Sequence, residues 1–519
     1  MEIRSLDELN LPLAWRRILF RMRRFIDVPD RLPFEVLDRL YGGDPELSRD
    51  HHLRPVTTVM ATKGSGTVRP FVRVSPIDLL LYQALVDRIA TDIEASLSSR
   101  QVLFSYRVDT SGSEDFFEGS PKWDDFMEAV RSELANDAYT HALTGDIASY
   151  FVYVDVDELE RRLLASCSAS DAVRDLSDLL RSWHQLGIRG LPQGMPPSSV
   201  LGNFYLSGLD VKLQTLGFNH KRYMDDFWIF TSSYEDARRA QDAVERLLYS
   251  DGLGLGGEKS RIRRTSTALA ATEPAQARIQ RRREELVDEV LGQSVGEYVD
   301  VEDVELPEAE IDTAAVHGEF DEIVLELGED RYPVDVRARL TEVFRSLEKG
   351  RDSYAVDQVP HLLIRLPDLM WPAIRYVASV RVEDAPAAEA ALLQLLDPSR
   401  FHREQEWLHL CRGGLWFRRH PSTALGARFA EVALQHEHQL VRARALLAWG
   451  RLSKTDDFAT ADAFWRTAER AWQAYVLIAL QHKDTSARDE RYANWSGEGR
   501  FLRMLASAIQ ERPFAWRDL

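Results

Sequence analysis

The apolar and polar positions divide the chain into regions with different periodicities. Near the start, arginines take the positions between apolar residues at helical spacing, which predicts a basic amphipathic helix with the apolar set Trp15, Ile18, Leu19, Met22, Phe25 and Ile26. Residues 55–265 alternate short β-rich runs with helical stretches, as in an antiparallel sheet backed by helices. From Val334 to Leu519 the periodicity is almost entirely helical. The pattern predicts an α+β region followed by an all-α region.

The C-terminal helical region contains one segment typical of a repeat. Residues 439–452 resemble the second helix of a HEAT-type repeat, whereas the other candidate repeats are degraded and broken by prolines. Helical pairs that stack on one another bury a continuous core. We therefore expect a HEAT-like helical-repeat domain over residues 334–519.

Composition limits the class of protein further. With 519 residues, the chain is long enough for about two or three domains. It is 45% hydrophobic, has no apolar run of membrane-spanning length and begins with the charged segment Met1-Glu2-Ile3-Arg4, so we expect a soluble cytoplasmic protein with no membrane partner. The two cysteines, Cys167 and Cys411, lie in different regions, which leaves a disulfide framework or a cysteine zinc site unsupported.

The most informative motif is Tyr223-Met224-Asp225-Asp226, which stands between Lys221-Arg222 and the apolar run 227–230. It reads as a tight turn between short strands. Adjacent carboxylates on such a turn repel each other, and a bound divalent cation offsets that repulsion. Asp146, in a segment 144–151 read as a strand that leads into a helix, would supply a third oxygen ligand for a hard cation such as Mg²⁺. Taken alone, the acidic turn is equally compatible with a surface hairpin.

Four segments in this order resemble the motifs of reverse transcriptases. Residues 146–151 look like the first palm motif, 191–199 (Leu-Pro-Gln-Gly-Met-Pro-Pro-Ser-Ser) like the second, and 223–226 like the third. Residues 253–260 are similar to the fourth, which normally ends in a lysine, here Lys259. On its own, the second segment would be an ordinary loop before a helix.

A glycine-containing segment upstream extends the resemblance. Residues 63–70 resemble the fingers hairpin of the same family, in which a lysine and an arginine grip the incoming triphosphate. Lys63 and Arg69 occupy those positions, and the match continues through residues 75–85. The resemblance covers roughly residues 55–265, about half the chain.

The resemblance implies a DNA polymerase that transfers nucleotides from dNTP with two Mg²⁺ ions, Mn²⁺ being an alternative. Asp146 and Asp225 would bridge the two ions, with Asp226 as a weaker or outer ligand. Lys63 and Arg69 would neutralise the triphosphate. The product would be DNA, and the resemblance leaves open whether an RNA template is used.

Further residues receive supporting roles from the same resemblance. Lys259 would protonate the departing pyrophosphate. Gln193 and Gly194 would lie under the template or nascent base pair, and Ser198 and Asn203 would hold that loop in place.

Phe151 follows Asp146 by five residues, where reverse transcriptases carry a bulky aromatic that blocks a 2′-hydroxyl. A ring there favours deoxynucleotides by steric exclusion. The alternative is an ordinary core aromatic at the end of a strand.

The net charge of −18 is unexpected for a polymerase, because neutralising phosphates supplies much of the affinity for nucleic acid. Residues 284–330 contain 18 acidic residues and no Lys or Arg, so the rest of the chain is balanced. Immediately before them lies a basic strip, consisting of Lys259, Arg261, Arg263, Arg264, Arg278, Arg281, Arg282 and Arg283. The strip either holds a primer or product strand or pairs with the acidic segment, and the sequence leaves both open. The acidic segment is read as a linker, a partner-docking surface or a mask over the cleft.

Within reverse transcriptases, the chain looks most like the bacterial defence-associated enzymes of the abortive-infection group. No ribonuclease H, integrase-like or maturase region follows the palm, and in that group a helical-repeat domain replaces the usual thumb. This resemblance implies anti-phage function, homo-oligomers and, in several members, template-independent DNA synthesis that starts from a protein tyrosine. The sequence does not choose among candidates such as Tyr41, Tyr298 and Tyr332.

Two other hypotheses stay open at this stage. One is an RNA-templated reverse transcriptase with a dedicated noncoding RNA. The other is a non-catalytic scaffold that senses nucleic acid, which the retained carboxylates and Lys259 disfavour. In every case we expect a helical region at 1–54, fingers and palm at 55–265, a basic then acidic connecting segment at 266–333, and the helical-repeat domain at 334–519.

Overall fold

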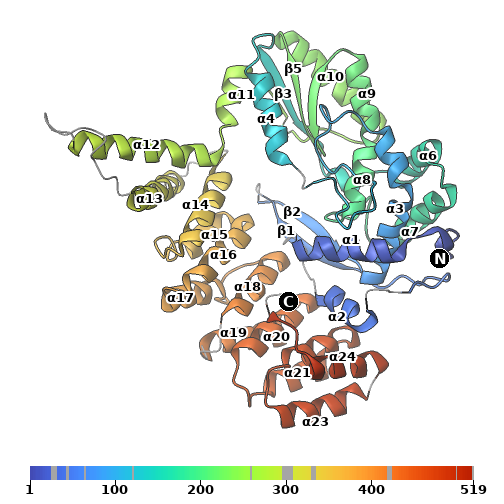
Figure 1. The fold of residues 1–519 in the computed structure, drawn as a ribbon, viewed down its shortest axis with the longest axis vertical. Coiled ribbons are helices and arrows are strands. Elements are labelled where there is room, and N and C mark those ends of the chain that lie inside the picture. The colour runs from blue at the N-terminus through green and yellow to red at the C-terminus, as the bar shows by residue number, and fades with distance from the viewer. Residues whose placement is uncertain are drawn as a thin grey trace. The chain divides into compact units, whose positions relative to one another are not determined.

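The chain divides into two compact units in the computed structural model (Figure 1). One unit comprises Met1–Val59 and Pro70–Thr272, and the other comprises Met60–Arg69 and Glu273–Leu519. The structure describes residues 1–24, 32–42, 46–63, 66–119, 122–257, 260–294, 308–328, 335–417, 423–497 and 499–516.

A four-stranded sheet in the order β4-β5-β3-β6 is the centre of the first unit. All its neighbouring strands are antiparallel, and their bounds are β3 His141–Asp146, β4 Asn219–Tyr223, β5 Asp226–Thr231 and β6 Arg261–Arg264. Successive residues of a strand face opposite sides of a sheet. Phe227 and Ile229 accordingly join the main core, whereas Phe230 joins a smaller core with Phe126 of α4 and Ala268 of α11.

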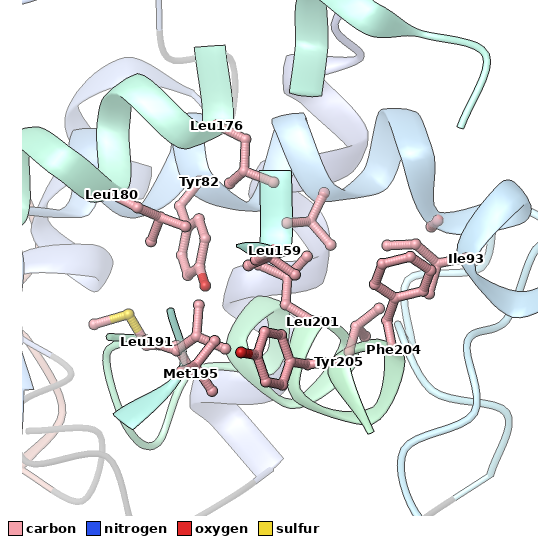
Figure 2. Close-up of a cluster of buried hydrophobic side chains, with 14 of the residues drawn as sticks. Tyr82, Ile93, Leu159, Leu176, Leu180, Leu191, Met195, Leu201, Phe204 and Tyr205 are labelled. Carbon is pink, nitrogen blue, oxygen red and sulfur yellow. The ribbon is translucent and has the colours of Figure 1, made fainter. Parts of the chain in front are cut away.

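Helices back the sheet and form most of the main core of this unit (Figure 1). Helix α3 begins at Pro76 behind the N-cap Ser75, whose side chain accepts the Asp78 main-chain N–H; both choices favour helix initiation. Figure 2 shows the cluster in which Tyr82 and Ile93 of α3 meet side chains of α6, α7 and α8. The helices and 3₁₀ turn of this unit are η1 Leu6–Glu8, α1 Leu11–Arg24, α2 Leu32–Tyr41, α3 Pro76–Ser96, α4 Trp123–Leu134, α5 Tyr150–Tyr153, α6 Val156–Ser166, α7 Ser170–Gln185, α8 Pro196–Tyr205, α9 Ser207–Thr215, α10 Tyr234–Ser250 and α11 Thr265–Ala271.

The predicted basic amphipathic helix corresponds to α1, which packs on α3. Trp15 and Ile18 are buried in the main core. On the same helix, Arg17 is only 4% exposed and pairs with Asp87 of α3 at 2.8 Å. Packing within the first unit therefore accounts for the apolar face of this helix and for one of its arginines. Phe25 and Ile26 lie outside the described residues.

The second unit is mostly helical after residue 273, and its helices stack in two rows. Helices α14, α16, α18, α20, α22 and α24 each pack on the next member of that row, and α15, α17, α19 and α21 do the same. Gly450 of α20 permits one such close approach, because a Cβ there would lie 2.3 Å from the Ala479 carbonyl oxygen of α22. The mostly helical C-terminal region is as predicted; its HEAT-like character stays a prediction.

The helices and 3₁₀ turns of this unit are α12 Ala275–Ser294, α13 Glu308–Gly328, α14 Val336–Gly350, α15 Val359–Arg365, η3 Pro367–Leu369, α16 Met370–Val380, α17 Ala385–Leu395, α18 Glu404–Trp416, α19 Thr423–Gln435, α20 Gln439–Leu452, α21 Ala459–Thr467, η4 Arg470–Trp472, α22 Gln473–Ala479, α23 Thr485–Ser496 and α24 Arg500–Glu511. None of the helices in the described ranges is long and apolar enough to cross a membrane.

Arginines of the basic strip pair with acidic residues in the second unit. Arg283 of α12 contacts Asp312 of α13 at 2.6 Å, and Arg282 of α12 contacts Glu322 of the same partner helix. Arg278 pairs with Asp335 at 2.9 Å. For Arg282 and Arg283 the structure supports pairing with the acidic segment 284–330, whereas the partner of Arg278 lies beyond that segment.

The β1–β2 hairpin, formed by Thr57–Thr62 and Val68–Arg73, has its tip in the second unit. There the Thr62 hydroxyl donates to the Glu406 carboxylate at 2.5 Å, and Arg403 donates to the same hydroxyl at 2.5 Å. The main-chain nitrogen of Met60 donates to Glu404 at 3.1 Å. The start of α18 therefore holds the tip of this hairpin.

Candidate active site

Two of the predicted carboxylates face each other across neighbouring strands. Asp146 is the last residue of β3, Asp226 is the first residue of β5, and the two are direct partners in the antiparallel register. Asp225 precedes Asp226 in the turn, and its carbonyl oxygen accepts the Ile147 N–H at 3.2 Å. The structure thus brings Asp146, Asp225 and Asp226 together. Like charges directly opposed on a sheet are destabilising unless something offsets them.

The strand predicted at 144–151 is shorter than expected at its far end. β3 ends at Asp146, and α5 begins at Tyr150 after Ser149, whose φ is 48°. This left-handed residue turns the chain out of the sheet directly after the carboxylate. Phe151 therefore lies in a short helix and not at the end of a strand.

The tight turn between β4 and β5 consists of Met224 and Asp225 and leads directly into Asp226. Its first residue, Met224, has a φ of 53°, a conformation in which glycine is usual and which costs about 1–2 kcal/mol for other residues. The Met224 side chain is buried against Gly202 of α8, where a Cβ would lie 3.0 Å from the Met224 Cε. Tyr150 packs on the same glycine and donates its hydroxyl to the Gly202 carbonyl at 2.6 Å.

The fourth motif runs beside Asp146. The Ala148 N–H donates to the Gly254 carbonyl at 2.9 Å, and the Gly256 N–H donates to the Asp146 carbonyl at 2.7 Å. Lys259, the predicted proton donor, lies outside the described residues.

The Leu-Pro-Gln-Gly loop is held from two sides. The Ser198 hydroxyl donates to the Pro192 carbonyl at 2.6 Å and exchanges a hydrogen bond with the Tyr82 hydroxyl at 2.9 Å. The predicted role of Ser198 is therefore confirmed. The role predicted for Asn203 is wrong, because its side-chain amide donates a hydrogen bond to the Ser105 carbonyl at 2.8 Å and not to the loop. Asn203 points toward the Met224 turn, where it meets a polar network.

Gln193 and Gly194 occupy the exposed bend of this loop. Gln193 is half-buried and Gly194 is exposed with a φ of 88°. A Cβ at Gly194 would lie 3.0 Å from the ring of Phe71 on β2. Glycine at 194 thus provides the left-handed conformation and the room for Phe71.

Phe151 links the first and second motifs through its main chain. Its carbonyl oxygen accepts the Leu191 N–H at 2.8 Å, and Gly190 lies so close to this oxygen that a Cβ would be 2.1 Å away. The Phe151 ring is half-buried and packs partly on the main core. That this ring acts as a steric gate stays a prediction.

Lys63 and Arg69 lie at the tip of the β1–β2 hairpin, in the second unit. The Lys63 N–H donates to the Thr67 carbonyl at 2.8 Å, and the Gly66 N–H donates to the Lys63 carbonyl at 2.8 Å. Both side chains are half-buried. That they act on the same substrate as the carboxylates stays a prediction.

Reasoning from sequence missed a buried network behind the Met224 turn. Arg222, Asp210, Asn203 and Ser105 are all at most 1% exposed and are joined by hydrogen bonds. The available clue was that β4, Asn219–Tyr223, has no aliphatic residue at its inward positions.

The region that contains this site is similar to a known protein family. Residues 61–282 match the family described as reverse transcriptase (RNA-dependent DNA polymerase), whereas no curated protein matches the chain. The predicted enzyme class is therefore confirmed: residues 61–282 indicate an RNA-directed DNA polymerase, which is a nucleotidyltransferase. Such a domain implies nucleotide substrates and a nucleic-acid template and product, and reverse transcriptases generally use divalent metal ions such as Mg²⁺.

The carboxylates fit a Mg²⁺ site that is completed by substrate. Within the described ranges, no three His, Cys, Asp or Glu side chains are grouped so that they could hold a metal ion by themselves. Mg²⁺ in nucleotide enzymes usually binds one or two carboxylates together with substrate phosphates and water. The facing pair Asp146 and Asp226, with Asp225 beside them, offers oxygen ligands of this kind.

Proposed function

We propose that the chain is a DNA polymerase of the reverse transcriptase type that acts in anti-phage defence and transfers nucleotides from dNTP. The observation that carries the catalytic part is the direct register of Asp146 and Asp226, next to Asp225, within the matched domain. Carboxylates that meet in this way are the oxygen ligands that Mg²⁺ takes together with substrate phosphates.

In this proposal a hydroxyl attacks the α-phosphate of dNTP in line, and the chain's residues hold the reactants. Asp146 and Asp225 bind the metal ions, with Asp226 as an outer ligand. When bound, two Mg²⁺ ions stabilise the charge that grows on the attacking and leaving oxygens. Lys63 and Arg69 neutralise the triphosphate.

The remaining predicted residues shape the substrate site. Gln193 and Gly194 support the nascent base pair, and Phe151 excludes a 2′-hydroxyl. Lys259 donates a proton to the departing pyrophosphate.

The double change Asp225→Ala with Asp226→Ala tests the catalytic part. It should abolish incorporation of labelled dNTP while the protein stays folded, because these residues lie at a turn and not in the core. The matched control is Asp124→Ala with Asp125→Ala, which removes two adjacent exposed carboxylates from α4. If the Asp225/Asp226 variant incorporated labelled dNTP at the wild-type rate, the catalytic assignment would be wrong.

The defence role, homo-oligomerisation and template-independent synthesis from a protein tyrosine rest on the resemblance to abortive-infection enzymes. Of the features behind that resemblance, the structure contains the mostly helical region that follows the polymerase region. Protein purified from cells should then carry covalently attached nucleic acid that is sensitive to DNase and is released by protease.

The second candidate is an RNA-templated reverse transcriptase with a dedicated noncoding RNA. The observation in its favour is the matched family itself, which is described as RNA-dependent. A protein without attached DNA that depends strictly on added template and primer would favour this candidate.

A further inference from the structure

Arg222 of β4 is a buried cation beside the catalytic turn. Its side chain is 1% exposed and forms a two-pronged ion pair with Asp210 of α9, with Nε–Oδ1 at 2.8 Å and Nη2–Oδ2 at 2.5 Å. Asp210 is fully buried. Two-pronged pairing of a guanidinium with a carboxylate fixes orientation as well as charge.

The third nitrogen of this guanidinium reaches the turn. Arg222 Nη1 donates to the Met224 carbonyl at 2.9 Å and to the Asn203 side-chain oxygen at 3.1 Å. The Met224 N–H donates to the Ser105 hydroxyl at 2.9 Å. The N–H and the carbonyl of Met224, the residue with the left-handed conformation, are thus both hydrogen-bonded to side chains.

Asn203 and Ser105 close the network. The Asn203 amide donates to the Ser105 carbonyl at 2.8 Å, and the Ser105 hydroxyl donates back to Asn203 at 3.3 Å. The main chain of Arg222 is fixed as well, because its N–H donates to the Val102 carbonyl at 2.7 Å. Each member of the network therefore has a partner on another segment of the first unit.

Burying an ion pair is costly, and such a pair is often replaceable by apolar side chains when only stability matters. Here the pair does something that apolar residues could not do, since it donates to the carbonyl of a strained turn residue. Burial lowers the pKa of Arg222, but the charges of Asp210 and, more weakly, of Asp225 outweigh it and the pKa is raised. Arg222 is therefore a permanent positive charge that interacts with a predicted metal ligand.

We propose that Arg222 and Asp210 are positioning residues: they lock the Met224 turn in the conformation that presents Asp225 and Asp226 to the metal ions. The inference rests on the proposed function, since it assigns these carboxylates to the metals. Arg222 touches the turn and not the substrate, so it acts through Met224.

The test compares Arg222→Met and Asp210→Asn with a control that loses a similar buried pair. Arg17→Met in the same unit breaks the Arg17–Asp87 pair, whose side chains are 4% and 6% exposed. Arg17 also contacts Ser113, Asp109 and the Phe116 ring, and Asp87 also accepts from Gln83. Binding of Mn²⁺ to the full chain, followed by electron paramagnetic resonance, is measured without turnover. The Mg²⁺ concentration for half-maximal dNTP incorporation is measured separately.

Arg222→Met and Asp210→Asn should each weaken Mn²⁺ binding by about 10-fold or more, the usual effect of removing a residue that orients a metal ligand. The Mg²⁺ requirement should rise in parallel, whereas Arg17→Met should change neither. A folded Arg222→Met protein with wild-type metal binding would overturn the inference, as would an equal shift in Arg17→Met.

Ser105→Ala covers the case in which Arg222→Met does not fold. It removes the hydroxyl that accepts the Met224 N–H and leaves the Arg222–Asp210 pair in place. A smaller shift of Mn²⁺ binding in the same direction supports the inference, and no shift contradicts it.

Wild-type protein that binds Mn²⁺ but incorporates no dNTP would instead refute the proposed function, and the comparison of Mn²⁺ affinities among variants would still decide the inference.

Discussion

The main-chain nitrogen of Gly256 donates a hydrogen bond to the carbonyl oxygen of Asp146 at 2.7 Å, and the Asp146 carboxylate fills the space beside its Cα. A Cβ at position 256 would lie 3.0 Å from Oδ2 of Asp146 and 3.2 Å from its carbonyl oxygen. The fourth motif thus limits where the first carboxylate can point. Glycine is favoured at position 256 by this close neighbour and not by the backbone conformation, because its φ is not in the left-handed region.

Gly256→Ala should displace the Asp146 carboxylate and lower dNTP incorporation on the order of 100-fold, as small misplacements of catalytic groups do. Stability should change little. Gly254→Ala is the matched control, because a Cβ at 254 would meet nothing within 4 Å. Equal rates in the two variants, measured as single-turnover incorporation, would contradict the close-contact argument.

Phe151→Ala should relax sugar discrimination more than it lowers dNTP incorporation, since removing the ring opens space without touching the carboxylates. The measurement is the ratio of kcat/KM for dNTP and rNTP. Tyr153→Ala, which removes an aromatic side chain 58% exposed at the end of the same helix, should leave the ratio unchanged. An unchanged ratio in Phe151→Ala would count against the gate.

Glu406→Gln should weaken the attachment of the hairpin tip to α18. Burial favours the neutral acid, but hydrogen bonds from His402 and Thr62 outweigh burial and hold the pKa of Glu406 below its usual value of 4.5. The carboxylate therefore contributes stability above about pH 4.5, and that contribution is lost as the pH falls through the lower, folded-state pKa.

Denaturant unfolding of the full chain checks this prediction. At neutral pH the free energy of unfolding of the wild type should exceed that of Glu406→Gln by roughly 1–2 kcal/mol, and this difference should disappear in acid. A difference that does not depend on pH would assign the loss to packing. If Lys63 and Arg69 bind the triphosphate as proposed, the KM for dNTP should also rise in the variant.

Deleting residues from 334 onward should abolish phage protection and oligomerisation, although every catalytic motif precedes that point. The deletion removes Arg403 and Glu406 and so frees the hairpin tip from its partners. Protection assays and light scattering provide the readouts. A truncated protein that stays soluble, assembles and protects like the full chain would make the helical region dispensable.

If synthesis starts from a tyrosine, mass spectrometry of nuclease-trimmed protein should find one nucleotide adduct. Among described tyrosines, Tyr82 and Tyr150 are unsuitable, because burial raises the pKa of each hydroxyl and shields it from substrate. Tyr249, which is 85% exposed, illustrates an accessible hydroxyl. Tyr298, Tyr332 and the side chain of Tyr41 lie outside the described residues.

Changing the modified tyrosine to Phe should stop initiation and spare extension of a supplied primer. The absence of any adduct, together with strict dependence on template and primer, would favour the RNA-templated candidate.

The sequence predicted those parts of the site that depend on local patterns. Asp225 and Asp226 are adjacent on a turn between apolar strands, so their proximity needed no tertiary information. Asp146 was placed by motif order, and the register with Asp226 agrees with that placement. The end of its strand was misplaced, because the left-handed Ser149 has no residue-type signature of a strand end.

The support behind the turn could not be predicted. Arg222 and Asp210 come from a strand and a helix, and only the packing of these two elements decides whether the side chains meet. In the sequence alone, a charged residue in a short strand is expected to be exposed to solvent. Asn203 was assigned to the wrong partner for the same reason. It lies close in sequence to the Leu-Pro-Gln-Gly loop, but its side chain faces Ser105.

The row of helices from α14 to α24, in which each member packs on the next, has an evolutionary consequence. Stability in such an array is a sum of neighbour interactions, so a pair of helices can be gained or lost with effects confined to its immediate neighbours. The length of this region can therefore drift between lineages without rebuilding a shared core. The four-stranded sheet has no such freedom, because losing either β3 or β5 would remove a carboxylate together with the strand that opposes the other.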